Sequence, residues 1–187
     1  MSADFAAARE IMVDSQVRTQ DVTDLALLDA MRAFPRERLV AKSWLAYADT
    51  EVEYAPGRWM LRPRDVAKLL QALKPRPMET ALAIAAPYAA EILARIGLTV
   101  TRLDAGDLKQ VDGTFDLIVC EGAVAKAPAS WVGALAPGGR LGVVERDGPV
   151  GRAMLYLRVG ENVGSRPMFD STPPILGGFE LVRGFRF

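Results

Sequence analysis

The chain has 187 residues, half of them hydrophobic, and its 23 lysines and arginines balance 23 aspartates and glutamates. This length and composition favour one domain, residues 1–187, with a large buried core. A formal charge of zero argues against nucleic acid or an anionic membrane as partner, since such binding needs clustered cations. The absence of histidine excludes a Ser-His triad and a histidine-ligated metal, and one cysteine cannot form a thiolate zinc cluster, so we expect no metal site.

The N-terminal sequence, residues 1–5, lacks the basic-then-apolar order of a signal peptide. No apolar run approaches the length of a membrane span. Cys120 has no second cysteine with which to form a disulfide. These features predict a cytoplasmic protein.

Residues 1–78 are predicted to form an N-terminal helical cap. The pattern indicates a helix over residues 4–19, followed by a second helix with Asp21 or Thr23 as its N-cap. Leucines and other apolar residues of the second helix recur on one face. Pro35 then ends this helix.

The rest of the cap contains an irregular connection and a third helix. The connection covers residues 41–62 and carries two tryptophans and two tyrosines. The third helix is predicted over residues 63–73, because Pro63 is well suited to a first helical turn. Prolines at 75 and 77 then break the helical pattern.

Residues 79–187 are predicted to form an alternating α/β core. The expected strands are 80–85, 98–103, 115–120 and 140–145, with helices near 87–96 and 128–135. Short apolar runs between turn signals are typical of buried parallel strands. Residues 152–159 and 179–187 are expected to add an antiparallel pair at the edge of the sheet.

Several segments carry a resemblance to a known family. Residues 113–123 and 135–144 resemble the fourth and fifth strands of S-adenosylmethionine-dependent methyltransferases, and are most similar to the protein-L-isoaspartate O-methyltransferase family. Residues 12–19, 31–39 and 47–49 resemble the substrate side of that family. The resemblance implies a Rossmann-like, mostly parallel sheet with an antiparallel C-terminal strand. It also implies S-adenosylmethionine as cofactor and an isoaspartyl-containing protein or peptide as substrate.

The turn after the first core strand departs from the family. There a glycine-rich loop holds the methionine portion of the cofactor, whereas this chain has Ala85, Ala86 and Pro87. Two alanine methyls and a proline without an N–H are poorly suited to close backbone contact with a ligand. Either this is a tight apolar turn that meets no ligand, or the cofactor tolerates the lost donors. By position, Ala85, Ala86 and Tyr88 are the candidate cofactor-binding residues.

The second departure follows Asp104, which occupies the usual place of the ribose-binding carboxylate. Only ten residues, 105–114, separate it from the next strand, whereas the family has a helix and a third strand there. Ten extended residues reach about 33 Å, and passing one neighbouring strand needs on the order of 20 Å. We therefore expect a sheet that lacks one edge strand and helix. Asp104 is either a solvated loop carboxylate or a ribose ligand.

The third departure concerns the methyl acceptor. The family places hydroxyl groups near the isoaspartyl carboxylate, at positions that are Trp59 and Leu61 in this chain, beside Arg62. By position these three are the catalytic candidates. Arg58, Arg62 and Arg64 would pair with a substrate carboxylate, or else form an exposed basic loop.

Glu121 lies at the carboxyl end of a central strand, where open α/β sheets bind their ligands. It would contact a ligand or cap the next turn. Cys120 beside it is expected to be a buried strand thiol and not a nucleophile, because no basic partner is near it in the sequence.

Two functions follow from these observations. The first is a degenerate family member without cofactor, acting as a binding or structural protein, with a homo-oligomer interface on the helices at residues 4–34. The alternative is an active S-adenosylmethionine-dependent carboxyl methyltransferase that repairs L-isoaspartyl residues in proteins.

Overall fold

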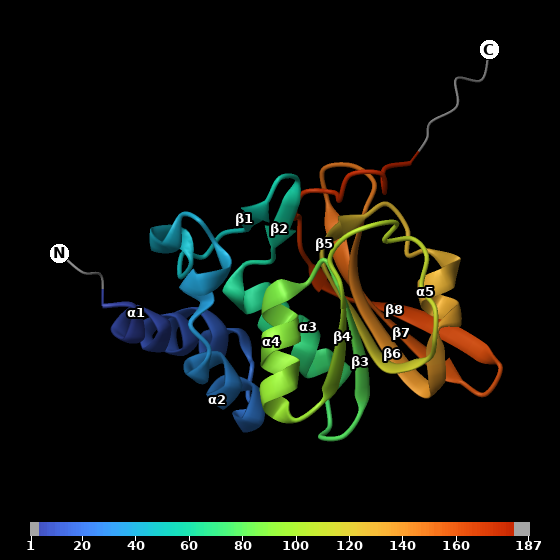
Figure 1. Ribbon diagram of the computed structural model, residues 1–187, viewed down its shortest axis with the longest axis horizontal. Coiled ribbons are helices and arrows are strands. Elements are labelled where there is room, and N and C mark those ends of the chain that lie inside the picture. The colour runs from blue at the N-terminus through green and yellow to red at the C-terminus, as the bar shows by residue number, and fades with distance from the viewer. Residues whose placement is uncertain (1–3, 182–187) are drawn as a thin grey trace, which may run out of the picture.

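A six-stranded sheet runs through the centre of the computed structural model, which describes residues 4–181 (Figure 1). The strand order is β4-β3-β5-β6-β7-β8. The strands are β3 (Thr80–Ile84), β4 (Thr99–Leu103), β5 (Phe115–Val124), β6 (Leu135–Arg146), β7 (Gly151–Val159) and β8 (Asn162–Asp170). The first four are parallel, and β7 and β8 are antiparallel to their neighbours. The expected α/β sheet with an antiparallel C-terminal edge is confirmed.

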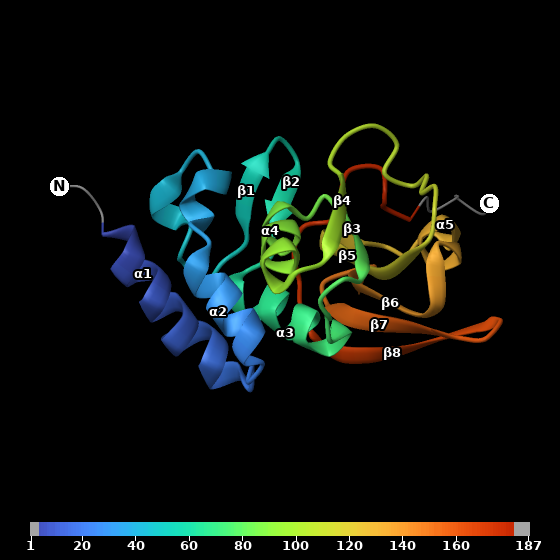
Figure 2. The ribbon, with the colours of Figure 1, turned by 60° about the horizontal axis from the view of Figure 1, so that its bottom comes forward.

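Helices cover the two faces of the sheet unequally. The helices are α1 (Phe5–Met12), α2 (Leu25–Ala33), α3 (Pro63–Leu73), α4 (Pro87–Ile96) and α5 (Ala129–Gly133). Figures 1 and 2 show α1 to α4 on one side of the sheet and α5 on the other. Side chains of β5 alternate accordingly: Leu117 and Val119 join the core under α1 to α4, whereas Ile118 packs in the core of Trp131.

The connection after β4 crosses the sheet directly, as its length predicts. β4 forms one edge of the sheet, and the chain passes β3 to enter β5. The Trp131 indole N–H donates to the Leu108 carbonyl at 2.7 Å, and the Ser130 hydroxyl donates to the Lys109 carbonyl. These bonds hold the connection against α5.

The N-terminal helices differ from the prediction in two respects. Residues 4–19 do not form one regular helix, because α1 passes into a π-turn at Val13–Val17 and a 3-10 turn at Arg18–Gln20. The N-cap of α2 is Asp24, whose carboxylate accepts from the Leu27 N–H at 3.1 Å. The choice of Asp21 or Thr23 was wrong, because three residues with cap-forming side chains lie within four positions and sequence does not rank them.

The last predicted strand was also wrong. The partner of β7 is β8 at residues 162–170, while residues 179–181 form no strand and residues 182–187 lie outside the described part. Gly164 and Pro167 made β8 resemble a loop, yet an edge strand tolerates both residue types. Phe179 instead packs its ring against Trp131, with centroids 5.4 Å apart.

The irregular connection before α3 contains a short hairpin. Its strands are β1 (Val52–Ala55) and β2 (Arg58–Met60), and Gly57 closes the turn with φ at +68°. Short 3-10 turns at Arg36–Leu39 and Ser43–Leu45 precede it. Within residues 4–181, every helix is too short or too polar to cross a membrane.

Candidate functional site

The turn between β3 and α4 is buried. Ala85 adopts a left-handed conformation with φ at +45°, and its N–H donates to the Leu103 carbonyl at 3.0 Å. Ala85, Ala86 and Tyr88 are each fully buried. A residue with a Cβ is strained at positive φ, so the surrounding contacts must hold Ala85 in place. The three positional cofactor candidates therefore present no surface to solvent.

Glu121 caps the first turn of α4. One carboxylate oxygen accepts from the N–H groups of Tyr88 at 3.1 Å and Ala89 at 2.8 Å. The other accepts from the N–H of Leu61 at 2.9 Å, and the side chain is fully buried. The free N–H groups of a helix N-terminus favour an anion, and here the anion comes from the chain itself. Glu121 thus caps the preceding helix rather than the turn that follows it.

Arg36 provides a buried positive charge for this carboxylate. It is fully buried, donates to the Leu61 carbonyl at 2.6 Å, and lies 4.4 Å from the centroid of the Tyr88 ring. Burial raises the pKa of Glu121, and the charge of Arg36 together with the three N–H donors opposes that rise. The N–H of Leu61 binds Glu121 and its carbonyl binds Arg36, so one residue links the two charges.

A C-terminal segment lies beside the end of β5. The N–H of Ala123 donates to the Pro174 carbonyl at 3.0 Å, and the N–H of Leu176 donates back to Ala123 at 2.8 Å. β6 flanks the other side of β5, so this segment takes the place that β3 leaves after Ile84. Gly122 permits the approach, because a Cβ there would come within 3.0 Å of Leu176. The carboxyl end of β3 is therefore covered by the chain.

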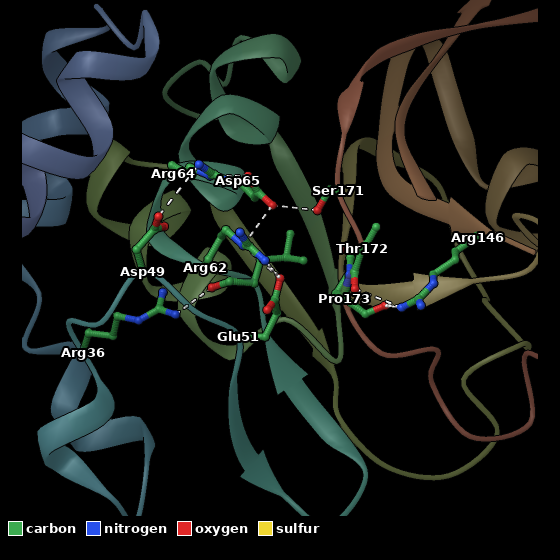
Figure 3. A network of polar contacts seen from close by, with 11 residues as sticks. Arg36, Asp49, Glu51, Arg62, Arg64, Asp65, Arg146, Ser171, Thr172 and Pro173 are labelled. Atoms are coloured by element: carbon green, nitrogen blue, oxygen red, sulfur yellow. Dashed lines mark hydrogen bonds and ion pairs between the residues drawn. The ribbon is translucent and has the colours of Figure 1, made fainter. Parts of the chain in front are cut away.

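Polar contacts fix this segment from two sides (Figure 3). The Ser171 hydroxyl donates to the buried Asp65 carboxylate, in the first turn of α3, at 2.7 Å. Arg146, at the end of β6, donates to the carbonyls of Thr172 and Pro173 at 2.9 Å each. The covering of the β3 end is thus anchored to both α3 and β6.

The arginines around the start of α3 are paired within the chain. Arg62 donates to Glu51 at 2.8 Å and 2.9 Å, and Arg64 lies 3.4 Å from Asp65 and 3.8 Å from Asp49 (Figure 3). The side chains of Arg62 and Arg64 are partly buried, with 22% and 34% of their surface exposed. The interpretation of these residues as an exposed basic loop is wrong, because acidic residues from the neighbouring loop neutralise them.

The remaining positional candidates lie apart from one another. Trp59 lines an open cavity of about 480 Å³ together with Tyr54, whereas Leu61 is fully buried. Asp104 is exposed and accepts from the Arg102 guanidinium at 2.8 Å. The structure thus brings together Tyr88, Glu121 and Leu61, and leaves Trp59 and Asp104 outside that group.

The sequence of this chain is similar to those of known proteins. A search of protein-family models finds none that matches the chain. The protein-L-isoaspartate O-methyltransferase of Methylorubrum populi is 31% identical over an alignment 181 residues long. The match covers 81% of this chain and 85% of that protein. The chain belongs to the protein-L-isoaspartate O-methyltransferase family. The namesake from Methylorubrum extorquens is 39% identical over 105 residues, or 54% of this chain and 46% of that protein, so the match spans about half of that relative.

Solved structures of the family share the fold. One protein-L-isoaspartate O-methyltransferase superimposes with a TM-score of 0.75 at 17% identity, over 91% of this chain and 66% of that chain. A Plasmodium falciparum protein is described as a putative member in complex with S-adenosyl-L-homocysteine. It superimposes with a TM-score of 0.71 at 15% identity, over 90% of this chain and 97% of that chain. At these identities the likeness establishes the fold alone.

Sequence reasoning missed Arg36 and Tyr54 at this end of the family fold, and named Arg58 only as a partner for a substrate carboxylate or as part of an exposed basic loop. Arg36 was missed because arginine is seldom fully buried and no pattern marks the exception. The Tyr54 hydroxyl and the Arg58 Nη1, on the unpredicted β1–β2 hairpin, are buried without a hydrogen-bond partner within residues 4–181. Cys120 is fully buried as predicted, and burial raises the pKa of its thiol, which disfavours the nucleophilic thiolate.

Proposed function

We propose that this chain is a non-catalytic member of its family that has lost the S-adenosylmethionine site and serves as a binding or structural protein. The observation that carries the proposal is the Glu121 carboxylate on the N-terminus of α4. Ligands of open α/β sheets bind at the carboxyl ends of the strands and use free N–H groups of the adjoining helix. Here those donors already hold an internal anion.

Two further observations support the same conclusion. The alanine turn that replaces the family's glycines is buried, and its backbone is turned inward. The C-terminal segment anchored by Ser171 occupies the position beside β5 above the end of β3. The residues present therefore do not fit S-adenosylmethionine bound in the family's manner, and we derive no catalytic step through it.

The alternative is an active methyltransferase that transfers a methyl group from S-adenosylmethionine to an L-isoaspartyl carboxylate. Family membership supports it, as do the donors of Tyr54 and Arg58 near the carboxyl end of the sheet, which have no partner among residues 4–181. The acceptor is already an anion, so alignment and exclusion of water would suffice for the reaction. Such activity tolerates the loss of acid–base groups but not the loss of the cofactor site.

Calorimetric titration with S-adenosyl-L-homocysteine separates the two functions. The Plasmodium falciparum relative serves as positive control, because its structure contains this ligand. We expect saturable heat for the control and none for this chain at millimolar ligand. Saturable binding in the micromolar range would falsify the proposal. Thermal unfolding provides a second measurement, since a ligand specific to the folded state must stabilise it.

A methylation assay provides the functional counterpart. Radiolabelled S-adenosylmethionine is offered with a synthetic isoaspartyl peptide, and the matching aspartyl peptide serves as control. We expect no label in either peptide with this chain. Label in the isoaspartyl peptide alone would establish the alternative function.

A homo-oligomer interface on the N-terminal helices belongs to the same proposal. Ile11 on α1 and Leu25 on α2 are 63% and 73% exposed, which suits contact with a second copy. Light scattering after size exclusion measures the mass directly. We expect a dimer or larger species that Ile11→Glu and Leu25→Glu shift to a monomer, and a monomeric wild type would contradict this part of the proposal.

A further inference from the structure

An open groove lies at the amino ends of the parallel strands, at the opposite end of the sheet from Glu121. Its volume is about 560 Å³, within the range of small-molecule and peptide-side-chain pockets. The floor consists of Leu155, Leu157 and Val159, alternate residues that share one face of β7. Leu157 and Val159 are 41% and 66% exposed, so the floor offers apolar surface.

The groove exists because α3 stops short of the hairpin. Lys74 ends the helix in a left-handed conformation with φ at +48°, and the chain then turns toward β3. Figure 2 shows the β7–β8 hairpin extending past the end of α3. Leu155 is buried near the helix, whereas Val159 lies near the tip of the hairpin.

The groove carries an excess of positive charge. Four cations line it and no carboxylate does. Arg140 is neutralised by two hydrogen bonds from its guanidinium to Glu79, at 2.9 Å each. Lys74, Arg76 and Arg166 form no ion pair with any residue between positions 4 and 181. In a chain of zero formal charge, three cations around one apolar floor that have no ion pair within residues 4–181 are a local concentration of charge.

We propose that this cationic groove binds an acidic peptide segment in which apolar and carboxylate side chains alternate. Lys74 and Arg76 follow α3, while Arg166 lies on β8 across the floor, so the cations are distributed and fit several carboxylates. An extended segment directs alternate side chains to opposite faces. Its apolar side chains contact Leu157 and Val159, and the long cationic side chains reach its carboxylates from the rim. The groove lies at the other end of the sheet from Glu121, so peptide binding there does not depend on whether the chain binds a cofactor.

Fluorescence anisotropy with synthetic peptides tests the proposal. The probe is a fluorescein-labelled peptide of alternating glutamate and leucine, and a peptide of alternating lysine and leucine is the control. We expect saturable binding of the acidic peptide alone, weakening as salt is raised, because salt screens exposed charges. Equal binding of both peptides, or no saturable binding of the acidic one, overturns the proposal. Binding of octanoate at this groove without peptide binding overturns it too.

Charge-reversal variants locate the binding. Arg166 is exposed, so Arg166→Glu should fold normally, and Arg152→Glu is the matched control on the same hairpin, at its open end and outside the groove lining. We expect Arg166→Glu to weaken binding about tenfold or more and Arg152→Glu about twofold or less. Equal weakening by the two variants would mean attraction by net charge and overturn the proposal. Val159→Asp is a second variant, expected to weaken binding while thermal unfolding stays unchanged.

Discussion

Charged side chains are buried at the carboxyl ends of the parallel strands and exposed around the groove at their amino ends. At the carboxyl ends, Glu121 and Arg36 are fully buried and joined through the peptide groups of Leu61. At the amino ends, Lys74 and Arg166 stand around an apolar groove without an ion pair within residues 4–181. At the end where most α/β sheets bind ligands, the Glu121 carboxylate already has three N–H donors, although the Tyr54 hydroxyl and the Arg58 Nη1 have no hydrogen-bond partner within residues 4–181.

This difference shows that the N–H groups of a helix at the usual ligand-binding end of a sheet can be bound by a side chain of the same protein. A helix N-terminus needs an acceptor for its N–H groups whether or not a ligand is present. Glu121 supplies that acceptor for α4 from within the chain.

Removing the carboxylate at the closed end should have the largest effect. Glu121→Ala leaves the N–H groups of Leu61, Tyr88 and Ala89 without an acceptor and Arg36 without a counter-charge. We expect the free energy of unfolding to fall by about 3–5 kcal/mol, measured by urea denaturation. Asp104→Ala, the exposed control, should change it by about 0.5 kcal/mol or less. Equal losses in the two variants would contradict the contrast.

Removing the cation at the closed end is the next test. Arg36→Met leaves the Leu61 carbonyl without its donor and Glu121 without its positive neighbour, so we expect a loss of about 3 kcal/mol. Combined with Glu121→Gln, the loss should be smaller than the sum by about 1 kcal/mol or more, because the sites couple. Arg18→Met, at an exposed pair with Asp14, is the control, with a loss below about 1 kcal/mol. Strict additivity would show that the two buried charges act separately.

The third test compares two cations of the open groove. Arg140 is bound by Glu79 and by the carbonyls of Leu73 and Lys74, whereas Arg166 has no such partner in the described part of the chain. We expect Arg140→Ala to lower the free energy of unfolding by about 2 kcal/mol. Arg166→Ala should change it by about 0.5 kcal/mol or less. A large loss for Arg166→Ala would mean that this cation stabilises the fold instead of remaining available to a partner.

The response to pH should differ in sign between the two ends, with the smallest effects. Burial raises the pKa of Glu121 above 4.5, so the folded chain binds more protons there than the unfolded chain, and this contribution falls as pH rises through that window. Hydrogen bonds from the N–H and hydroxyl of Thr80 lower the pKa of Asp116 below 3.8, so its contribution is lost as pH falls through the folded pKa. Urea denaturation measures the free energy of unfolding across the pH range. Glu121→Gln should remove the part of its fall that occurs as pH rises above 4.5, and Asp116→Asn should remove the part of its fall that occurs as pH drops below 3.8. An unchanged fall above pH 4.5 in Glu121→Gln would contradict the first statement.

Much of the architecture could be predicted from local patterns. The parallel strands, their intervening helices and the antiparallel edge follow from apolar runs and turn residues. The ten residues after Asp104 predicted a direct crossover, because their reach allows one neighbouring strand to be passed. The errors lie at β8 and the cap of α2, where glycine, proline and repeated cap residues leave local preference undecided.

The site itself depends on contacts that no local pattern contains. By itself the sequence determined the resemblance to the family, the segments that form the parallel strands, and the alanine turn after β3 where the family has glycines. Only the tertiary structure decided that Glu121 binds Ala89, 32 positions earlier, and Leu61, 60 positions earlier. The sequence of a helix shows where its first N–H groups will need acceptors. It does not show which residue will accept from them, and here that residue comes from a neighbouring strand. For the same reason, only the tertiary structure shows that Lys74 and Arg166 form no ion pair with the described residues, 4–181.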